Sequence, residues 1–411
     1  MKSNYKRIGD HIQLVDERNV DLSITTLLGL SITKQFIPSV ANTIGTNMKN
    51  YKVIRKGQFA CSIMQVRRDK KMPVALLKDM DEAIISQAYP VFEVKDNKEL
   101  LPEYLMMWFT RPEFDRHAEF LAVGGVRGSL EWDDFCDMTL PVPSPAKQQA
   151  IVDEYQVITR RISILEQLNA KLEETAQAIY KHWFVDFEFP DEQGKPYKTS
   201  GGKMIWNEEL DKEVPEGWEV KTLGSLTNKI GSGSTPRGGK AAYKEKGIPL
   251  IRSMNIHDLR FEYKDLAFID EVQASKLDNV IVNAGDVLIN ITGASVARCS
   301  LVPQELAGGR VNQHVSIVRP KSKNLQIYIL CHLLSSDSKQ QLLGVSGSGS
   351  TREALTKGDL EEYELLSPKP RISSLFEFYL GSVINKLYNS IVEINELEKI
   401  QGILLGRVSI G

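Results

Sequence analysis

The sequence has few cysteines and no long apolar run. Its 411 residues contain only four cysteines, which lie far apart and form no CxxC pair: Cys61, Cys136, Cys299 and Cys331. This spacing argues against a disulfide framework or a zinc site and favours a reducing compartment, the cytoplasm. No apolar run approaches the roughly 18 residues that cross a bilayer. The N-terminal MKSNYKRIGD lacks the apolar stretch of a signal peptide. We therefore expect neither secretion nor membrane insertion.

The sequence also lacks catalytic motifs. The segment GSGSTPRGGKAAY (residues 231–243) looks like a phosphate-binding loop, but Gly239 stands where a P-loop needs Lys, and Ala241 follows Lys240 where it needs Ser or Thr. The chain contains no Pro-Pro, so the Asn/Asp-Pro-Pro-aromatic motif of an amino-methyltransferase is absent. PDEQGK (residues 190–195) has the wrong spacing for a metal nuclease, and the histidines form no HExxH motif. We expect binding surfaces and a scaffold, with neither a catalytic site nor a metal site.

The length and composition are those of a globular protein with several domains. Apolar residues make up 42% of the chain and charged residues 25%, with a net charge of −2. These values exclude a disordered or fibrous chain. A chain of 411 residues is also longer than one hydrophobic core usually serves. Two or three domains are therefore expected.

A large internal repeat defines the organisation of the chain. A shift of about 225 residues superimposes the two halves, with the same order of strand, strand, helix, Gly-rich turn, short helix, strand and proline break in each. The shift aligns Gln87 with Gln313, Tyr104 with Tyr328, Arg127 with Arg352, and Asp134 with Asp359. A period of this length indicates duplication of a whole domain rather than a solenoid repeat.

A long helix is expected after each proline break. Ser144-Pro145 and Ser367-Pro368 each read as a helix N-cap followed by proline at the first helical position. Apolar residues then alternate at spacings of four and three, which is the pattern of a coiled-coil seam. The seam positions are Ile151, Tyr155, Ile158, Ile162, Leu165, Asn169, Leu172, Ala176, Ile179 and Trp183 in the first helix, and Phe376, Leu380, Val383, Leu387, Ser390, Ile394, Leu397, Gln401, Leu404 and Val408 in the second.

Neither seam can be buried alone, so the two helices are expected to pack against each other as an antiparallel intramolecular coiled coil. Three polar residues, Asn169, Ser390 and Gln401, interrupt the apolar seam. They either fix the register of the pair or mark frayed, wet positions. The sequence leaves both possibilities open.

The expected fold is of the α/β (α+β) class, with two similar globular domains, two long helices and a pseudo-two-fold internal repeat. The first globular domain covers residues 1–143 and the central long helix residues 144–190. A polar, Gly-bearing linker follows over residues 191–217. The second globular domain covers residues 218–367, and the C-terminal long helix residues 368–411.

Positive charge is concentrated in two blocks. Residues 49–71 contain eight basic residues and one acid, a balance of +7, and residues 229–252 contain six basic residues and one acid, a balance of +5. Two such blocks could form two polyanion-binding faces, although runs of Lys and Arg are also common in solvated loops. Charge alone does not decide between these readings.

Several segments of the sequence match a known family pattern. They are KHWFVDFEFP (residues 181–190), VPEGWEVKTLGSL (214–226), LVDERN (14–19), GLSITKQFIPSVANTIG (29–45), and SGSTP (232–236) with GIPLIRSMNI (247–256). These segments resemble the specificity subunits of type I restriction-modification systems, and the similarity extends over essentially the whole chain. The second helix departs from the family pattern because it has no counterpart of WFVDF.

The resemblance implies a non-catalytic subunit that confers DNA sequence specificity. Each globular domain would be a target-recognition domain that reads one half of a bipartite target in the major groove. The helices would set the spacer and dock two methyltransferase subunits, and restriction (motor) subunits would join the complex. S-adenosylmethionine, ATP and Mg²⁺ would belong to those partners, with no cofactor on this chain. Half-sites read from one face would lie about 10 bp apart.

The resemblance and the basic blocks together define candidate DNA-binding residues. Lys and Arg neutralise phosphates, whereas Arg pairs with guanine and Asn or Gln with adenine. Residues shared by both copies are better suited to structural or phosphate contacts than to specificity, because the two half-sites are expected to differ. The candidates are Lys49, Lys52, Arg55, Arg67, Arg68, Gln87 and Arg127 in copy one, and Ser234, Thr235, Arg237, Lys240, Arg252, Asn255, Gln313 and Arg352 in copy two.

Two other classes of protein compete with this prediction. A coiled-coil adaptor without DNA specificity would explain the helices and would not be retained on DNA at low salt. A stand-alone methyltransferase or nuclease would explain DNA binding but requires motifs that the sequence lacks. Binding of labelled S-adenosylmethionine to the isolated chain would identify a stand-alone methyltransferase.

Overall fold

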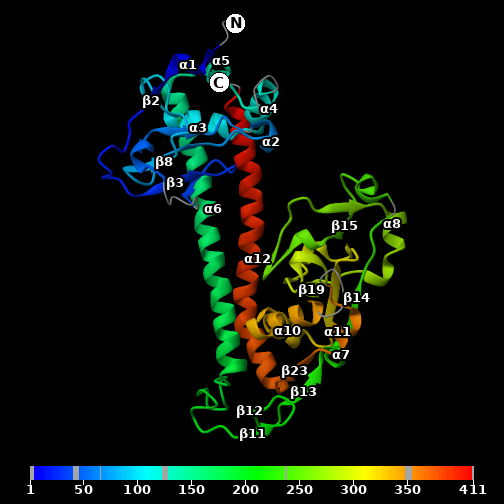
Figure 1. The fold of residues 1–411 in the computed structure, drawn as a ribbon. Coiled ribbons are helices and arrows are strands. Elements are labelled where there is room, and N and C mark those ends of the chain that lie inside the picture. The colour runs from blue at the N-terminus through cyan, green and yellow to red at the C-terminus, as the bar shows by residue number, and fades with distance from the viewer. Residues whose placement is uncertain are drawn as a thin grey trace. The chain divides into compact units, whose positions relative to one another are not determined.

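The computed structural model describes residues 4–39, 46–64, 66–122, 128–236, 238–347 and 354–409, without the side chain of Lys240. The chain divides into two compact units. Unit 1 comprises Met1–Ile162 with Glu396–Gly411, and unit 2 comprises Ser163–Asn395. Each unit thus contains one globular part and a portion of each long helix, α6 and α12 (Figure 1).

Unit 1 is built on two four-stranded sheets, whose strand orders are β2-β9-β6-β7 and β4-β3-β8-β5. Strands β3 and β8 run parallel, and the other pairs are antiparallel. The elements are β1 (Tyr5–Arg7), α1 (Ile8–His11), β2 (Ile12–Val15), β3 (Leu27–Leu30), β4 (Phe36–Pro38), η1 (Met48–Asn50), β5 (Lys52–Arg55), β6 (Phe59–Cys61), α2 (Val66–Asp69), β7 (Val74–Leu76), β8 (Glu82–Ile85), β9 (Val91–Val94), α3 (Pro102–Thr110), α4 (Pro112–Leu121), α5 (Trp132–Asp137) and β10 (Thr139–Pro141).

Unit 2 contains a hairpin followed by a second set of sheets. Its elements are β11 (Met204–Asn207), β12 (Lys212–Pro215), β13 (Glu219–Thr222), α7 (Leu223–Leu226), β14 (Thr227–Ser232), η4 (Gly239–Ala242), β15 (Ile248–Ile251), η5 (Ser253–Asn255), β16 (Ile256–His257), β17 (Arg260–Phe261), β18 (Ala267–Ile269), α8 (Glu271–Ser275), η6 (Asp278–Val280), β19 (Val287–Asn290), η7 (Gly293–Ser295), β20 (Cys299–Leu301), η8 (Gln304–Leu306), β21 (Arg310–Val311), β22 (Val315–Pro320), η9 (Lys323–Leu325), α9 (Gln326–Leu334), α10 (Ser336–Gly347), α11 (Lys357–Glu361) and β23 (Glu364–Ser367).

The sheets of unit 2 repeat the topology of unit 1. The order β14-β22-β19-β20 matches β2-β9-β6-β7 strand for strand. In the second sheet, β15 pairs in parallel with β21, as β3 does with β8, and β15 pairs in antiparallel with β18, as β3 does with β4. An isolated bridge between Ile281 and Arg310 takes the place of the pairing of β5 with β8. The predicted duplication of a whole domain is confirmed.

Equivalent residues make equivalent contacts in the two units. Tyr104 and Tyr328 are buried, and their hydroxyls donate to the carbonyls of Pro141 (3.2 Å) and Leu366 respectively, which satisfies a buried polar group in each core. Gly9 is needed where α1 crosses α5, because a Cβ there would lie 2.8 Å from Cβ of Cys136. The same crossing of α7 over α11 requires Gly224.

Each unit has two apolar clusters. The larger cluster of unit 1 packs the aromatic rings of Phe59, Phe92, Phe109 and Phe135 between the sheet of β6 and helices α3 to α5. A smaller cluster fills the space between the two sheets, and unit 2 repeats this arrangement. Burial of each large apolar side chain stabilises the fold by about 1.5–3 kcal/mol. Within the described ranges, no helix combines the length and apolar character needed to cross a membrane.

The two long helices are α6 (Pro145–Tyr180) and α12 (Pro370–Arg407). Helix α6 begins as predicted, and the carbonyl of Ser144 accepts from the amide of Gln148 (3.0 Å). The predicted start of the second helix at Ser367-Pro368 is wrong. Strand β23 still runs through Ser367, and α12 begins two residues after Pro368, with the Lys369 carbonyl accepting the first helical amides.

The predicted seam is confirmed in each unit taken by itself. All the seam positions are buried or half-buried. In unit 1, Gln401 donates to Thr159 (2.9 Å) and Arg407 to Glu154 (3.1 Å), so rising numbers on one helix meet falling numbers on the other. In unit 2, Asn169 bonds Ser390, and the ring of Trp183 lies 5.5 Å from that of Phe376. The helices are therefore antiparallel in both units.

The predicted extension of the first helix to residue 190 is wrong. A single π-helical turn, Lys181–Val185, follows α6, and Phe187 then adopts a left-handed backbone (φ 59°), which ends the helix. The segment leaves the helix because its rings fill the core of unit 2. The buried rings of this segment are Trp183, Phe184, Phe187 and Phe189, and they belong to the same apolar cluster as Trp218. The predicted linker also contains structure, since β11 and β12 form an antiparallel hairpin within it.

Candidate nucleic-acid interface

Two members of the first basic block are committed to carboxylates of unit 1. Arg55 donates to Glu17 through Nε (3.0 Å) and Nη2 (2.6 Å), and to Glu82 through Nη1. The side chain of Lys52 is only 13% exposed, and its Nζ lies 3.6 Å from Asp16. Glu17 and Glu82 raise the pKa of the Arg55 guanidinium, and Asp16 lies beside the Lys52 ammonium. Arg55 and Lys52 therefore have little charge to offer a phosphate.

Four exposed cations of unit 1 lie in α2 and the turn after it, namely Arg67, Arg68, Lys70 and Lys71. Arg68 is held by Asp69, to which it donates through Nε (2.7 Å) and Nη2 (3.1 Å). A Cβ on Gly128 would lie 2.9 Å from Cβ of Arg67, which places the residues after the predicted Gly-rich turn against α2. The exposed cations without a side-chain partner in the described part of unit 1 include Lys49, Arg67, Lys70 and Lys71.

Three connections of unit 1 meet beyond the end of β6. The amide of Cys61, the last residue of β6, donates to the carbonyl of Pro90 (3.1 Å), at the end of the connection that carries Gln87. The amide of Leu130 donates to the carbonyl of Ile63 (2.9 Å), so the segment before α5 reaches the same place. The exposed side chain of Gln87 and the cations of α2 thus belong to neighbouring connections.

The same connections meet in unit 2 beyond the end of β19. The amide of Ile291 donates to the carbonyl of His314 (3.0 Å), next to the exposed Gln313. The amide of Leu355 donates to the carbonyl of Ile291 (2.8 Å). The duplication therefore applies to this convergence of loops as well as to the sheets. Loops that converge on a rigid sheet are where binding residues are commonly placed.

A chain of hydrogen-bonded polar side chains crosses this region of unit 2. The hydroxyl of Thr235 donates to Oε1 of Gln313, whose Nε2 lies 2.9 Å from Nε2 of His314. Nδ1 of His314 lies 2.5 Å from the hydroxyl of Thr292. The amide of His314 also donates to Oδ1 of Asn312 (3.0 Å), which fixes the backbone beneath the ring. The sequence predicted Thr235 and Gln313 but did not identify Thr292 or His314, since their proximity depends on the fold.

Two candidates in the second basic block have structural positions. Asn255 is fully buried, accepts from the amide of Arg252 (3.1 Å) and donates to the carbonyls of Glu262 (3.0 Å) and Lys264 (3.3 Å). Its amide has no exposed group to offer a base, so this candidate is corrected to a structural residue. Arg252 is half-buried, and its guanidinium donates to the carbonyl of Asp265, so its side chain has little conformational freedom to reach DNA.

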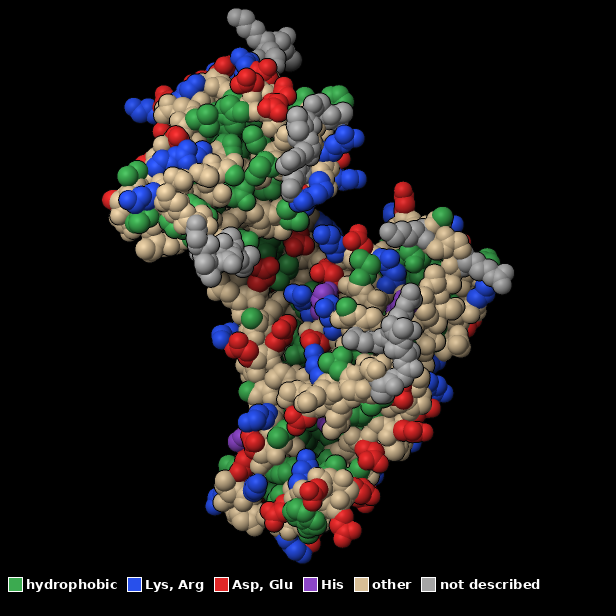
Figure 2. Space-filling model, in the orientation of Figure 1, with side chains coloured by type: hydrophobic (Ala, Val, Ile, Leu, Met, Phe, Trp, Pro, Cys, Tyr) green, Lys and Arg blue, Asp and Glu red, His purple; other side chains and the backbone are tan. Residues whose placement is uncertain are grey.

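The remaining candidates are exposed or lie outside the described residues. Ser234 is exposed in the loop that follows β14. Arg127, Arg237 and Arg352 lie outside the described residues, as does the side chain of Lys240. Basic and acidic side chains are interspersed over the visible face of unit 2 (Figure 2). Charge in unit 2 is therefore distributed rather than gathered into one basic surface on that face.

A buried ion pair supports the loops of unit 1. Lys34, in the turn between β3 and β4, donates to Oδ1 of Asp115 (2.7 Å), which also accepts from the amide of Met72 (3.1 Å). Desolvation lowers the pKa of Lys34, and the carboxylate of Asp115 opposes this shift. One carboxylate thus joins the β3–β4 turn, α4 and the segment that follows the cations of α2. No pattern in the sequence predicted this pair.

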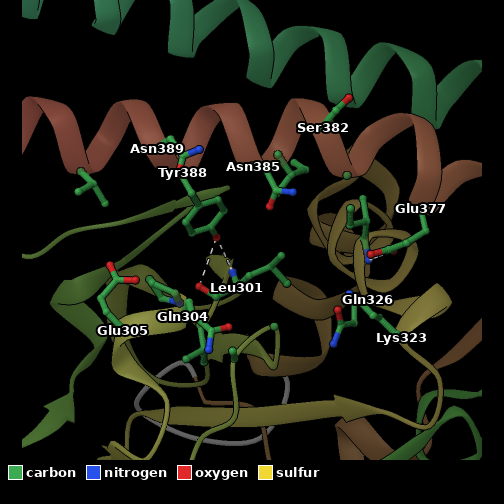
Figure 3. Close-up of a pocket in the computed structure, with 18 of the residues that line it drawn as sticks. Leu301, Gln304, Glu305, Lys323, Gln326, Glu377, Ser382, Asn385, Tyr388 and Asn389 are labelled. Atoms are coloured by element: carbon green, nitrogen blue, oxygen red, sulfur yellow. Dashed lines mark hydrogen bonds between the residues drawn. The ribbon is translucent and has the colours of Figure 1, made fainter.

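Unit 2 also has a groove of about 930 Å³ along α12 (Figure 3). The hydroxyl of Tyr388 accepts from the amide of Leu301 (2.7 Å) and donates to its carbonyl (3.3 Å), which ties α12 to β20. The charged residues of the lining are Glu305, Glu377 and Lys323. Burial raises the pKa of Glu377. With two acids against one lysine, the groove does not suit a polyanion.

Comparison with known proteins finds one matching family and two relatives, and all three are described by the same role. The family described as "Type I restriction modification DNA specificity domain" matches residues 42–174 and 215–398. The chain is 27% identical over 315 residues to the type I restriction enzyme MjaIX specificity subunit of Methanocaldococcus jannaschii, which covers 76% of this chain and 69% of that protein. It is 22% identical over 405 residues to the HindI specificity subunit of Haemophilus influenzae, which covers 87% of this chain and 86% of that protein.

A solved structure shares the fold. The crystal structure of the type I restriction-modification S subunit from M. genitalium aligns with a TM-score of 0.59, at 16% identity, over 99% of this chain and 96% of that one. At this identity the likeness concerns the fold alone. The family match is separate from it and covers more than half of the chain, including parts of both copies of the repeat. The chain therefore belongs to the type I restriction-modification DNA specificity family, as a non-catalytic specificity subunit.

Proposed function

We propose that each unit reads one half of a bipartite DNA target in the major groove. The observation that carries this proposal is the convergence of the same connections beyond β6 and β19, with different side chains in the two units. Unit 1 presents cations such as Arg67 there, whereas unit 2 presents the neutral side chains of Gln313 and Thr292. One scaffold with two sets of loop residues is suited to two different half-sites.

Cationic side chains provide affinity for DNA, and side chains that form paired hydrogen bonds with bases provide specificity. The exposed cations Lys49, Arg67, Lys70 and Lys71 contact phosphates and provide a salt-dependent attraction to any sequence. Specificity comes from groups that form paired hydrogen bonds with base edges. The block residues Lys52 and Arg55 contribute little to either, because acids of unit 1 already hold them.

The long helices set the spacer and dock two methyltransferase subunits. At about 1.5 Å per residue, the 36 residues of α6 span roughly 54 Å. Apolar side chains that lie outside the seam support a docking role, since exposed apolar groups mark interaction surfaces. They include Val157 and Ile164 on α6 and Phe378 and Tyr379 on α12. Restriction (motor) subunits complete the complex, and S-adenosylmethionine, ATP and Mg²⁺ are bound by the partners.

Long-read mapping of methylated bases tests the proposal. A host that carries the gene together with the methyltransferase gene should show one bipartite methylated motif, and deletion of this gene alone should abolish it. The purified full-length chain should also be retained on DNA at low salt. A coiled-coil adaptor would leave the methylation map unchanged and would not be retained, which would contradict the proposal.

A further inference from the structure

The side-chain amide of Gln313 is held from both sides although it is exposed. Thr235 bonds its oxygen, and Nε2 of His314 lies 2.9 Å from its nitrogen. His314 is itself fixed by Thr292 through its ring and by Asn312 through its backbone. A free glutamine on a surface loses considerable rotamer freedom when it binds a ligand. Here most of that freedom is already removed, as in a binding site whose supporting contacts pre-position the reading group.

The hydrogen bonds that remain open on this amide form a defined pattern. A primary amide has two N–H donors and an oxygen with two lone pairs. Thr235 and His314 each use one of these positions, so one donor and one acceptor of the amide remain open. The result is the same if the oxygen and nitrogen are exchanged, because Thr235 can accept and the His314 ring can donate.

We infer that Gln313 is a specificity-determining residue that reads an adenine in the half-site bound by unit 2. In the major groove only adenine offers an N–H donor beside an acceptor nitrogen, N6 and N7, whereas guanine offers two acceptors there. The open donor of Gln313 matches N7 and its open acceptor matches the N6 amino group. This inference rests on the proposed function and adds the identity of one base and the residue that reads it.

The equivalent glutamine of unit 1 lacks this support. Gln87 is followed by Ala88, whose amide donates to the Ser86 hydroxyl (3.4 Å), and no ring stands where His314 does. The side chain of Gln87 has no hydrogen-bond partner within the described ranges. Residues shared by both copies were expected to be structural or to bind phosphate. The two glutamines differ in their neighbours, so Gln87 is a matched control for Gln313.

A duplex with one altered atom tests the inference directly. The target is first mapped in cells, and the full-length chain in its methyltransferase complex is then titrated with duplexes in which each adenine of the second half-site is replaced in turn by 7-deazaadenine, which lacks the N7 acceptor. At one position the wild-type affinity should fall about tenfold. Gln313→Ala should bind the unmodified target about tenfold more weakly and should show no further loss with that modified duplex. Gln87→Ala, which alters the unit that binds the other half-site, should lose the same fraction of its own affinity with that modified duplex as the wild type does.

The outcomes separate this inference from the proposed function. If Gln313→Ala weakened every duplex equally and kept the full response to 7-deazaadenine, Gln313 would contact the backbone and the inference would be wrong. A wild-type response at no position would also overturn it. A wild-type complex that bound no duplex selectively would instead refute the proposed function. Unchanged thermal unfolding of Gln313→Ala excludes misfolding, and Gln313→Glu, which exchanges the donor for an acceptor, provides a second comparison.

Discussion

Asn169 of α6 and Ser390 of α12 share a buried hydrogen bond within the otherwise apolar seam of unit 2. The hydroxyl of Ser390 also reaches the carbonyl of Leu387 (2.8 Å), whereas the Asn169 amide has no other side-chain partner in the described part of the chain. A slip of either helix would place the Asn169 amide against apolar side chains. Of the two possibilities that the sequence left open for these residues, the contact favours a pair that sets the register.

Removal of one partner of this hydrogen bond should destabilise unit 2 more than removal of both partners. Ser390→Ala leaves the buried amide of Asn169 without its partner and should lower the free energy of unfolding of unit 2 by about 1–3 kcal/mol. Asn169→Leu together with Ser390→Ala should recover most of this loss, because neither polar group then remains. Urea unfolding of the full chain measures both effects. Equal and additive losses in the single and double variants would contradict the assignment.

The second polar contact of the seam provides the control. Gln401 and Thr159 of unit 1 also join the two helices, but their hydrogen bond is exposed. Water can replace either partner, so Gln401→Ala should change the free energy of unfolding by less than about 0.5 kcal/mol. A loss as large as that of Ser390→Ala would show that burial does not distinguish the two contacts.

Stability should depend on pH through a buried histidine of unit 2. His332 lies between the hydroxyls of Tyr180 (2.7 Å from Nδ1) and Tyr363 (3.3 Å from Nε2). Desolvation, with a smaller contribution from Lys212, lowers the pKa of His332 to about 4 from an ordinary value of 6.5. Between these values the unfolded chain takes up a proton that the folded chain does not, so stability falls as the pH drops from 6.5 to 4 and levels off below 4.

The expected loss is about 3 kcal/mol, because each pKa unit corresponds to about 1.36 kcal/mol. His332→Gln keeps a donor and an acceptor for the two tyrosines but cannot titrate. Between pH 7 and pH 4 the free energy of unfolding of this variant should therefore fall by about 3 kcal/mol less than that of the wild type. Unfolding of both proteins at the two pH values measures the difference. Parallel pH profiles for the two proteins would show that His332 is accessible to protons in the folded state.

Salt dependence should distinguish free from paired cations in the first basic block. Arg67→Ala removes an exposed cation and should reduce the slope of log K against log salt concentration by about 0.9. Arg55→Ala should leave the slope unchanged, because Glu17 and Glu82 already balance that charge. The sequence predicts a change of about one each for Arg237→Ala and Lys240→Ala. Affinity measured across a salt series checks all four variants, and equal slopes for wild type and Arg67→Ala would remove α2 from the interface.

The length of the helices should control the spacer of the target. Insertion of one heptad into both α6 and α12 preserves the seam, because seven residues restore its phase. The half-sites should remain the same while the number of base pairs between them changes, as seen by methylation mapping. An insertion of four residues in α6 alone breaks the phase and should destabilise the pair. An unchanged spacer after the double insertion would refute the role of the helices as a ruler.

The sequence by itself determined the features that repeat. The shift of about 225 residues, the alternating seam and the absence of catalytic motifs were all visible in residue order, because duplication and helical period leave regular traces along a chain. The start of the second helix was misplaced at Pro368, since strand pairing of Ser367 with Glu219 outweighs a local N-cap pattern.

Only the tertiary structure decided which of the candidate residues are available. Lys52 and Arg55 look like any other members of a basic block until the fold brings Asp16 and Glu17 beside them. Gln87 and Gln313 are the same residue at equivalent positions, yet among the residues that the structure describes only Gln313 has side-chain partners, since Thr235 reaches it across 78 residues of sequence. Contacts between distant residues depend on how sheets and loops pack, and that packing leaves no period in the sequence.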